Sequence, residues 1–323
     1  MKDENAFYVK NIVDNEISEN TKRVDTAKIV EKVQKNIIEL SDKDFIEVMI
    51  GCFIPDVYRD QGKKEKLYTK ISELLVGEWW RRMGGTYKLP TKKSGTEDVE
   101  MILNDCSIVC DAKIFRLGRS QKAPNVKDFL KLASVAKWME NLKDKYEKNN
   151  KLQKVLDGLV TYPSLHEWEK DSEVYQECSN SKVRVIMLPY EILALLLERK
   201  ETFILNEFLN LWNYDIVDMK ESKNKDDYWK IVTPFLCELL DIDEKTYGKT
   251  IEGYRKQILC AKKMYKKLIE DDIEEKRKAI EEDINSFSDT EELKNYVYKR
   301  LEEFENQKNK MYLSRIDKYR KYS

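Results

Sequence analysis

The spacing of apolar residues changes along this chain, and the change limits the folds that it can adopt. Early segments repeat their apolar residues every three or four positions, which predicts helices. They are 25–40, 41–49 and 63–83. Four later segments are short apolar runs that predict strands: 97–103, 107–115, 155–162 and 183–188. From residue 201 onward only helical spacing recurs.

These segments predict an α+β protein in which strands and helices form an α/β core. We expect three regions: a helical segment at 1–60, the core at 61–200 and a helical region at 201–323. Residues 1–24 are polar and are expected to be loosely ordered. Trp79 and Trp80 are neighbours on a predicted helix, so we expect only one of them to face inward.

Residues and motifs that this chain lacks exclude several classes of catalytic and binding site. It has a single histidine, His166, which excludes HNH nucleases, HExxH peptidases and cytidine-deaminase-like zinc sites. Its cysteines form no CxxC pair, so a zinc site is not expected. The phosphate-binding patterns GxxxxGKS/T and GxGxxG are absent. If the chain is an enzyme, carboxylates and lysine must carry its chemistry.

Charge and hydropathy limit its partners. The 59 basic and 60 acidic residues nearly cancel, so a DNA-binding face must come from local clustering. The N-terminal segment MKDENAFYVKNIVDNE is too polar for a secretory signal. No uncharged apolar stretch approaches the length of about 18 residues that a membrane span needs. We therefore expect a soluble intracellular protein whose cysteines are free thiols.

One acid-x-lysine tripeptide stands inside a predicted strand: Asp111-Ala112-Lys113. Because side chains alternate along a strand, Asp111 and Lys113 project from one face. Asp98 begins the preceding strand, and hairpin pairing can bring it beside Asp111. Two carboxylates and a lysine suit Mg²⁺-assisted phosphodiester hydrolysis, in which the ion activates a bound water and neutralises charge on the phosphate. The lysine can orient that water or help to deprotonate it.

The same tripeptide pattern also arises by chance in a chain of which 37% is charged. Four other matches lie in helical or loop patterns that are typical of solvated surface, and they begin at Glu198, Asp218, Asp243 and Glu274. Only Asp111 follows an apolar strand and has an acid on the strand before it. On context alone, an edge strand with a structural salt bridge is the more frequent outcome for such an aspartate.

The segment around this tripeptide, SIVCDAKIFRLGR, resembles the active-site strand of the HindIII-type family of Type II restriction endonucleases, in the PD-(D/E)xK superfamily. The residues that match the family pattern V-x-D-A-K-x-F-R-L-x-R are Val109, Asp111, Ala112, Lys113, Phe115, Arg116, Leu117 and Arg119. Asp98-Val99 matches an acid-valine pair of the preceding strand. The similarity covers about 63–195, with an apparent insertion at 139–154, and is not traced beyond it.

The resemblance implies a restriction-endonuclease-like fold, with a central mixed β-sheet flanked by helices and a mainly helical C-terminal region. It implies that Asp98 and Asp111 bind the metal and that Lys113 is the catalytic lysine. Asp128 matches a family aspartate near the site, although it is equally placed to cap a helix. Glu73 lies where many such nucleases place an accessory carboxylate, but a surface ion pair on the helix is the more frequent role.

The resemblance also implies a reaction and its partners. The reaction is Mg²⁺-dependent hydrolysis of double-stranded DNA at a short palindromic sequence, with Mn²⁺ as a possible substitute and 5′-phosphate products. A two-fold homodimer would read such a sequence. A cognate DNA methyltransferase is expected in the same bacterial cytoplasm.

A basic loop leaves the predicted catalytic strand and is the candidate for DNA contact. It has no acidic residue between positions 113 and 127. The candidate DNA-binding residues are Arg116, Arg119, Lys122, Asn125 and Lys127. The basic side chains can contact phosphates or guanine edges, whereas Asn125 can contact adenine or cap the following helix.

Two other functions stay open. A repair or resolving nuclease of the same fold would prefer branched DNA, whereas a restriction enzyme would cut plasmid DNA into discrete fragments. A DNA-binding or assembly protein on a degenerate nuclease scaffold would not cleave at all. The complete set of Asp98, Asp111 and Lys113 argues against the degenerate scaffold. The helical region at 201–323 is expected to serve DNA binding, dimerisation or both.

Overall fold

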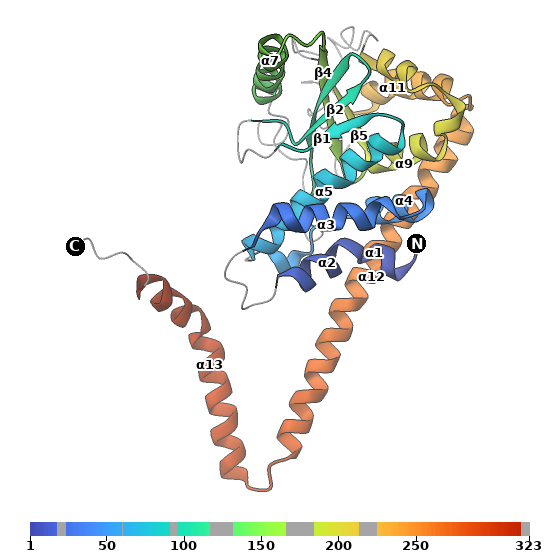
Figure 1. The fold of residues 1–323 in the computed structure, drawn as a ribbon. Helices are drawn as coiled ribbons and strands as arrows, with labels where there is room; N and C mark the ends of the chain where they lie inside the picture. Colours follow the sequence, from blue (N-terminus) through green and yellow to red (C-terminus); the bar gives the residue numbers. More distant parts are fainter. Residues whose placement is uncertain are drawn as a thin grey trace, which may run out of the picture. The chain divides into compact units, whose positions relative to one another are not determined.

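A computed structural model describes residues 1–17, 24–59, 61–90, 96–116, 132–165, 184–212 and 225–317 (Figure 1). The chain separates into two compact units, Met1–Met264 and Tyr265–Ser323. Among the described helices, none combines the length and the apolar character that crossing a membrane requires.

A five-stranded mixed sheet organises the first unit (Figure 1). Its strands, in spatial and chain order, are β1 (Thr86–Lys88), β2 (Val99–Leu103), β3 (Cys106–Ala112), β4 (Lys154–Tyr162) and β5 (Val185–Pro189). Strands β1, β2 and β3 pair antiparallel, whereas β3, β4 and β5 pair parallel. The expected α+β class with a central mixed sheet is therefore confirmed.

The sheet departs from the sequence-based expectation in two places. Strand β1 was not predicted, because it has only three residues and follows the helix end directly. The strand predicted at 107–115 ends at Ala112, so Lys113 lies just beyond it. Lys113 still follows the strand's path, because its backbone N–H donates to the Thr161 carbonyl of β4 at 2.8 Å.

Helices surround this sheet in the first unit (Figure 1). They are α1 (Asp3–Ala6), α2 (Tyr8–Glu16), α3 (Thr26–Ile38), α4 (Asp42–Ile50), η1 (Asp56–Tyr58), α5 (Gly62–Arg82), α7 (Leu132–Lys148), α9 (Tyr190–Glu198), η3 (Lys200–Thr202), α10 (Leu205–Phe208), η4 (Leu209–Trp212), α11 (Lys225–Leu239) and the first part of α12 (Glu244–Asn285). Helix α7 continues well into 139–154, the segment that resembled an insertion.

The expectation of a loosely ordered N-terminus was wrong for the residues that the structure describes. Helices α1 and α2 occupy most of residues 1–17. Val9 and Val13 lie one helical turn apart and are both buried in the core. Their four-residue spacing was the available signal, and the polar composition of the segment hid it.

Helix α5 buries both of its tryptophans, contrary to the expectation that only one would face inward. The Trp79 indole N–H donates to the Leu193 carbonyl of α9 at 2.8 Å. The Trp80 indole N–H donates to the Ile102 carbonyl of β2 at 3.0 Å. Because α5 packs against the sheet as well as against α3 and α9, side chains on different sides of this helix are all covered.

Helices α5 and α7 approach the sheet closely through glycines. A Cβ added to Gly77 of α5 would meet the Tyr87 ring of β1 at 2.5 Å, so this contact admits no larger residue. A Cβ added to Gly158 of β4 would meet Cγ1 of Val135 on α7 at 2.7 Å. These glycines let α5 come near β1 and α7 come near β4, the strands on either side of β2 and β3.

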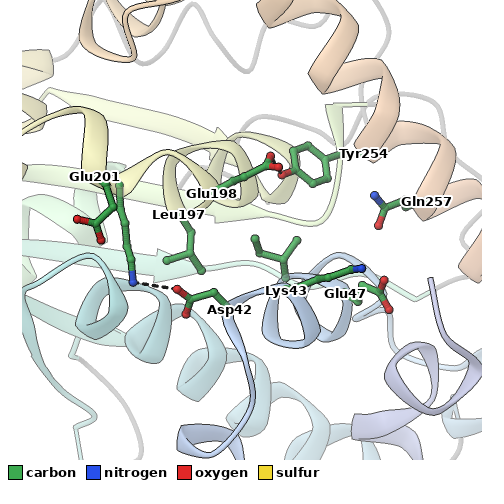
Figure 2. Close-up of a pocket in the computed structure, with 10 residues that line it drawn as sticks. Asp42, Lys43, Glu47, Leu197, Glu198, Glu201, Tyr254 and Gln257 are labelled. Atoms are coloured by element: carbon green, nitrogen blue, oxygen red, sulfur yellow. Dashed lines mark hydrogen bonds and ion pairs between the residues drawn. The ribbon is translucent and has the colours of Figure 1, made fainter.

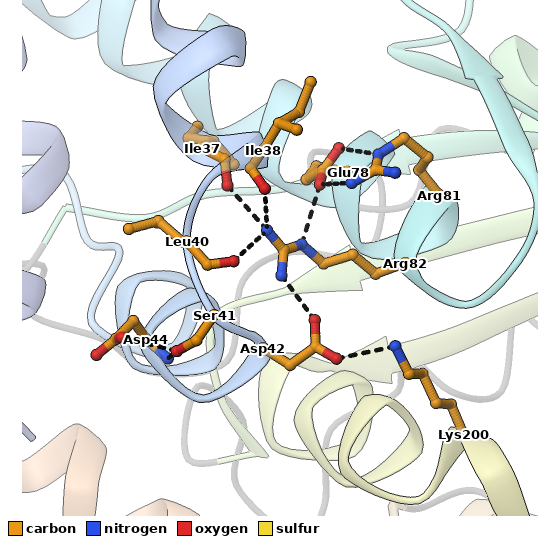
Figure 3. A network of polar contacts seen from close by, with 10 residues as sticks. All are labelled: Ile37, Ile38, Leu40, Ser41, Asp42, Asp44, Glu78, Arg81, Arg82 and Lys200. Carbon is orange, nitrogen blue, oxygen red and sulfur yellow. Dashed lines mark hydrogen bonds and ion pairs between the residues drawn. The ribbon is translucent and has the colours of Figure 1, made fainter.

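Arg82 fixes the C-terminal end of α5 (Figure 3). Its guanidinium donates to the carbonyls of Ile37 and Leu40, in the connection between α3 and α4. It also pairs with Asp42 at 2.6 Å and with Glu78 at 2.9 Å. Because the Arg82 side chain is almost fully buried, these acceptors satisfy a charge that water cannot reach.

The second unit contains the rest of α12 and helix α13 (Thr290–Asp317). Every residue from 266 to 285 is exposed. Contacts form where the two helices connect: the rings of Phe287 and Tyr296 have centroids 5.0 Å apart, and the Tyr296 hydroxyl donates to Asp283 at 2.8 Å. The Asp289 carboxylate caps α13 by accepting the Glu291 N–H, as its position before the helix predicts.

Candidate active site

The register of β2 and β3 brings Asp98 and Asp111 together. Val99 pairs with Cys110, so Asp98 stands opposite Asp111 at the end of the ladder. The Asp98 N–H donates to the Cys110 carbonyl at 3.1 Å. The Asp98 carboxylate turns toward β3 and accepts the Ala112 N–H at 3.0 Å. The predicted hairpin juxtaposition of the two acids is therefore present.

Asp111 is buried, with only 2% of its surface exposed. Lys113 Nζ lies 2.7 Å from Asp111 Oδ2 and forms an ion pair with it. Despite this short distance, Oδ2 has no hydrogen-bond partner of acceptable geometry among the described residues. A buried carboxylate oxygen with an ion-pair neighbour but no directed donor is open to an additional ligand.

Glu73 of α5 joins these two acids. Its side chain is 4% exposed and is paired with Lys70, whose Nζ lies 2.5 Å from Oε2. Burial raises the pKa of Glu73, and the negative charge of Asp111 adds to the effect. The expected helical ion pair exists, but it lies beside the two strand carboxylates rather than on an open surface.

Burial and the two neighbouring acids, Asp111 and Glu73, disfavour the ionised form of Asp98. Burial raises the pKa of Asp98 to about 8, with further contributions from the charges of Asp111 and Glu73. Lys113 opposes the rise without cancelling it. The raised pKa favours the protonated form of Asp98 near neutral pH, and a bound cation would oppose it.

The donor set fits a hard divalent cation. Carboxylate oxygens are the ligands that Mg²⁺ prefers, and Mg²⁺ usually takes one or two of them together with waters and substrate phosphates. Within the described ranges, no three or more histidine, cysteine or acidic side chains already converge in the manner of a complete metal cage. Asp98 and Asp111 suit the partial coordination that leaves positions for water and phosphate.

A family model described as HindIII restriction endonuclease matches residues 8–307. The chain belongs to the HindIII restriction endonuclease family. Membership implies a Type II restriction endonuclease with DNA as its substrate, and the family generally uses a divalent metal. Among curated proteins no match was found. The resemblance inferred from the catalytic strand is confirmed, and it extends over most of the chain, including part of the region in which it was not traced.

The candidate DNA-binding residues of this family member lie mostly outside the described residues. This applies to Arg119, Lys122, Asn125 and Lys127, and also to the accessory candidate Asp128. Arg116 is described: its Nη2 donates to both carboxylate oxygens of Glu65 on α5 at 2.8 Å. Arg116 is half-buried, so contact with DNA would have to compete with Glu65.

A second buried carboxylate, which the sequence did not single out, lies two residues from Asp98. Glu100 accepts a short hydrogen bond from the Tyr146 hydroxyl of α7. It also pairs with Lys88 at 3.0 Å and with Lys145 at 3.3 Å. The Tyr146 hydroxyl is 2.9 Å from Ser107 Oγ of β3, so this network joins α7 to three strands. The helical spacing of α7 gave no sign of this role.

A pocket of about 480 Å³ lies among α4, α9 and α12 within the first unit (Figure 2). Its lining includes the ion pair between Lys200 and Asp42, at 2.8 Å, and a hydrogen bond from Tyr254 to Glu198. None of its lining residues belongs to the Asp98–Asp111 cluster. This pocket is therefore separate from the candidate site at Asp98 and Asp111.

Proposed function

We propose that this family member is a Mg²⁺-dependent Type II restriction endonuclease that cuts double-stranded DNA at a short palindromic sequence and leaves 5′-phosphates. Asp98 and Asp111 bind the metal, for which Mn²⁺ can substitute, and Lys113 is the catalytic lysine. The observation that carries the proposal is the buried Asp111 carboxylate, which lies between the Asp98 carboxylate and the Lys113 ammonium, the latter at 2.7 Å from Oδ2.

Each side chain has a distinct task. Asp111 presents its Oδ2 to a ligand, and Asp98 supplies a second oxygen once its proton has left. Lys113, held beside Asp111 by the ion pair, directs its ammonium to the phosphate oxygens or to the attacking water. The bound metal supplies Lewis acidity and lowers the pKa of a coordinated water.

Glu73 serves as an accessory carboxylate in this proposal. It is buried beside the metal-binding acids, and Lys70 compensates its charge. Asp128 could supply a further acid, as the family match suggests. Residues Arg116, Arg119, Lys122, Asn125 and Lys127 would contact the DNA backbone or bases, because their loop leaves the catalytic strand directly.

A palindromic site is read most simply by two copies related by two-fold symmetry. We therefore include a homodimer in the proposal. The host must protect its own copies of the same sequence, so a cognate DNA methyltransferase is the expected companion in the bacterial cytoplasm.

The test is digestion of unmethylated phage DNA by the purified protein in Mg²⁺ buffer. Wild type should give discrete fragments, and Asp111→Ala and Lys113→Ala should give none. Glu274→Ala is the matched control, because Glu274 begins the same acid-x-lysine pattern on an exposed helix and should leave cleavage unchanged. Absence of cleavage by wild type in both Mg²⁺ and Mn²⁺, or equal activity of Asp111→Ala, would reject the proposal.

A further inference from the structure

The second unit exposes an unusual number of large apolar side chains. On α12 they are Leu268, Ile269, Ile273, Ile280 and Ile284. On α13 they are Val297, Tyr298, Leu301 and Phe304. Because helices in water normally bury such residues against a partner, the second unit lacks the surface that would cover them.

Four of these residues form one face of α12, here named the α12 stripe: Ile269, Ile273, Ile280 and Ile284. At about 100° per residue, intervals of four, seven and four positions keep the four side chains within about 60° of each other. Leu268 is exposed but lies about 100° away from Ile269. The four isoleucines therefore share one side of α12, which Lys276 borders between Ile273 and Ile280 at about 20° outside the arc.

A second face on α13, here named the α13 stripe, consists of Leu293, Val297, Leu301 and Phe304. The intervals of four, four and three positions again place the side chains on one side of a helix. Leu293 is partly buried near the helix connection, and the other three are exposed.

The two stripes match in a single antiparallel register. It aligns three pairs of residues: Ile284 with Leu293, Ile280 with Val297, and Ile273 with Phe304. This register pairs six of the eight stripe residues with each other, and it places Leu301 opposite Lys276.

Charges beside the stripes agree with the same register. It brings Glu281 near Lys294 and Lys276 near Glu303, which are pairs of opposite charge. The α12 segment from 266 to 285 contains eight acidic and five basic residues, so it would repel a phosphate backbone. These charges favour helix pairing with a protein partner over contact with DNA.

Among the described residues of the second unit, α13 does not cover the α12 stripe. The contacts at the helix connection are made, as Phe287 meets Tyr296 and Tyr296 bonds to Asp283. Even so, Ile280 is 53% exposed and Phe304 is 73% exposed. Two identical chains can form a dimer by exchanging a matching helix, at a low cost in free energy.

We propose that the second unit is the dimerisation element, in which the α12 stripe of one copy pairs antiparallel with the α13 stripe of a second copy. Two such pairings, related by a two-fold axis, would cover all four stripes of the dimer. The inference deepens the proposed function, because it rests on the homodimer that a palindromic site requires.

The first experiment asks whether the pairing joins two chains. Full-length Ile280→Cys is mixed with full-length Val297→Cys, incubated to allow exchange, and oxidised. We expect a covalent dimer on non-reducing gels from the mixture, and none from either variant alone or from wild type. A disulfide within one chain of the Ile280→Cys/Val297→Cys double variant, at monomer mass and without a covalent dimer, would show that the hairpin closes on itself and would overturn the proposal.

The second experiment measures the assembly by analytical ultracentrifugation. Ile273→Lys/Ile280→Lys should weaken the dimer by about a hundredfold or more, since it buries two unpaired ammonium groups in the pairing. Leu268→Lys adds charge outside the stripe and should leave the dimer unchanged. A monomeric wild type, or a dimer that tolerates the double substitution, would refute the proposal. Both readouts are independent of cleavage, so a failed nuclease assay and a failed assembly assay remain distinguishable.

Discussion

Two carboxylates at the start of β2 lie two residues apart and have opposite electrostatics: Asp98 precedes the strand, and Glu100 is buried within it. Burial alone would raise the pKa of Glu100, but the hydrogen bond from Tyr146 and the ion pairs with Lys88 and Lys145 outweigh it and hold the pKa below its usual value. The pKa of Asp98 is raised to about 8, by burial and by neighbouring acids. The start of β2 thus carries one carboxylate whose charge lysines and a tyrosine stabilise and one whose ionisation burial and neighbouring acids disfavour.

The contrast separates a structural acid from a ligand-binding acid. Glu100 already has its cations and its hydrogen bonds, so an added metal would have to displace them. Asp98 differs, because burial and the charges of Asp111 and Glu73 disfavour its ionised form, an effect that a bound cation would oppose. A cluster that is electrostatically unfavourable when empty is what a metal site requires.

The largest effect on cleavage is expected when one carboxylate in each of the two clusters is replaced by an amide. Asp111→Asn should reduce cleavage by about 10³-fold, because the metal loses a ligand, and should leave the fold intact. Glu100→Gln should keep cleavage within about tenfold of wild type but lower the free energy of unfolding by about 1–3 kcal/mol. Cleavage kinetics and urea unfolding measure the two quantities. Equal loss of cleavage in both variants would remove the distinction between the clusters.

Lys113 provides the next largest effect. Lys113→Met keeps much of the side-chain volume but removes the ammonium, and it should lower the rate of cleavage by about 10²-fold or more. Lys88→Met removes a cation from the Glu100 cluster and is the matched control, with cleavage expected near the wild-type rate. Single-turnover cleavage at saturating enzyme measures both rates. A Lys113→Met enzyme that cuts at the normal rate would exclude a catalytic role for this lysine.

The pH dependence of metal binding tests the raised pKa of Asp98. A metal must displace the proton from Asp98 below pH 8, so the apparent Mg²⁺ affinity should rise by up to about tenfold per pH unit and then level off above it. Calorimetric titration in buffers of different ionisation enthalpy would show about one proton released per metal at pH 7. The same titration of Asp98→Asn should show no such release. An affinity that is constant between pH 6 and pH 8 would contradict the raised pKa.

Glu191 extends the comparison to an acid whose hydrogen bonds and the charge of Arg255 do not outweigh the effect of burial. It is fully buried at the start of α9 and accepts from Ser164 Oγ at 2.7 Å and from the Leu165 N–H. Burial raises its pKa to about 7 in the folded state, so the folded protein keeps this proton to higher pH than the unfolded chain and loses stability as pH rises from about 4.5 to 7.

Glu191→Gln should therefore gain stability relative to wild type as the pH increases. The expected change in the difference between the two free energies of unfolding is about 1 kcal/mol between pH 6 and pH 8. Urea unfolding at several pH values measures it, with Glu274→Gln on exposed α12 as the control. A pH-independent difference would mean that hydrogen bonds alone keep Glu191 ionised in the fold.

Local patterns predicted the strand residues of the candidate site but not its helical partners. Asp98, Asp111 and Lys113 could be recognised because alternation and hairpin pairing are local rules that hold within about 20 residues of chain. The proximity of Glu73 and Lys70 depends on how α5 packs against the sheet, which no local pattern encodes. Glu100 was overlooked for a related reason, since its cations come from β1 and α7.

Local sequence patterns also predicted only part of the fold. Helical spacing predicted α3, α4 and α5, and short apolar runs predicted four of the strands, because both patterns are visible in the sequence. The short strand β1 and the N-terminal helices were not predicted, since few residues define them and tertiary contacts stabilise them. The burial of both Trp79 and Trp80 also follows from packing on more than one side of α5, which is a property of the assembled core.

The hydrogen bonds of Trp79 and Trp80 determine how fast the Glu73 carboxylate can move relative to Asp98. With Trp79 bonded to α9 and Trp80 bonded to β2, helix α5 cannot roll or slide without breaking contacts on both sides. Glu73 can therefore change its distance to Asp98 only by rotating its own side chain. Such rotations in proteins are far faster than the microseconds to milliseconds of helix or domain movement. Rearrangement of this carboxylate around an arriving cation should therefore never limit the rate of turnover.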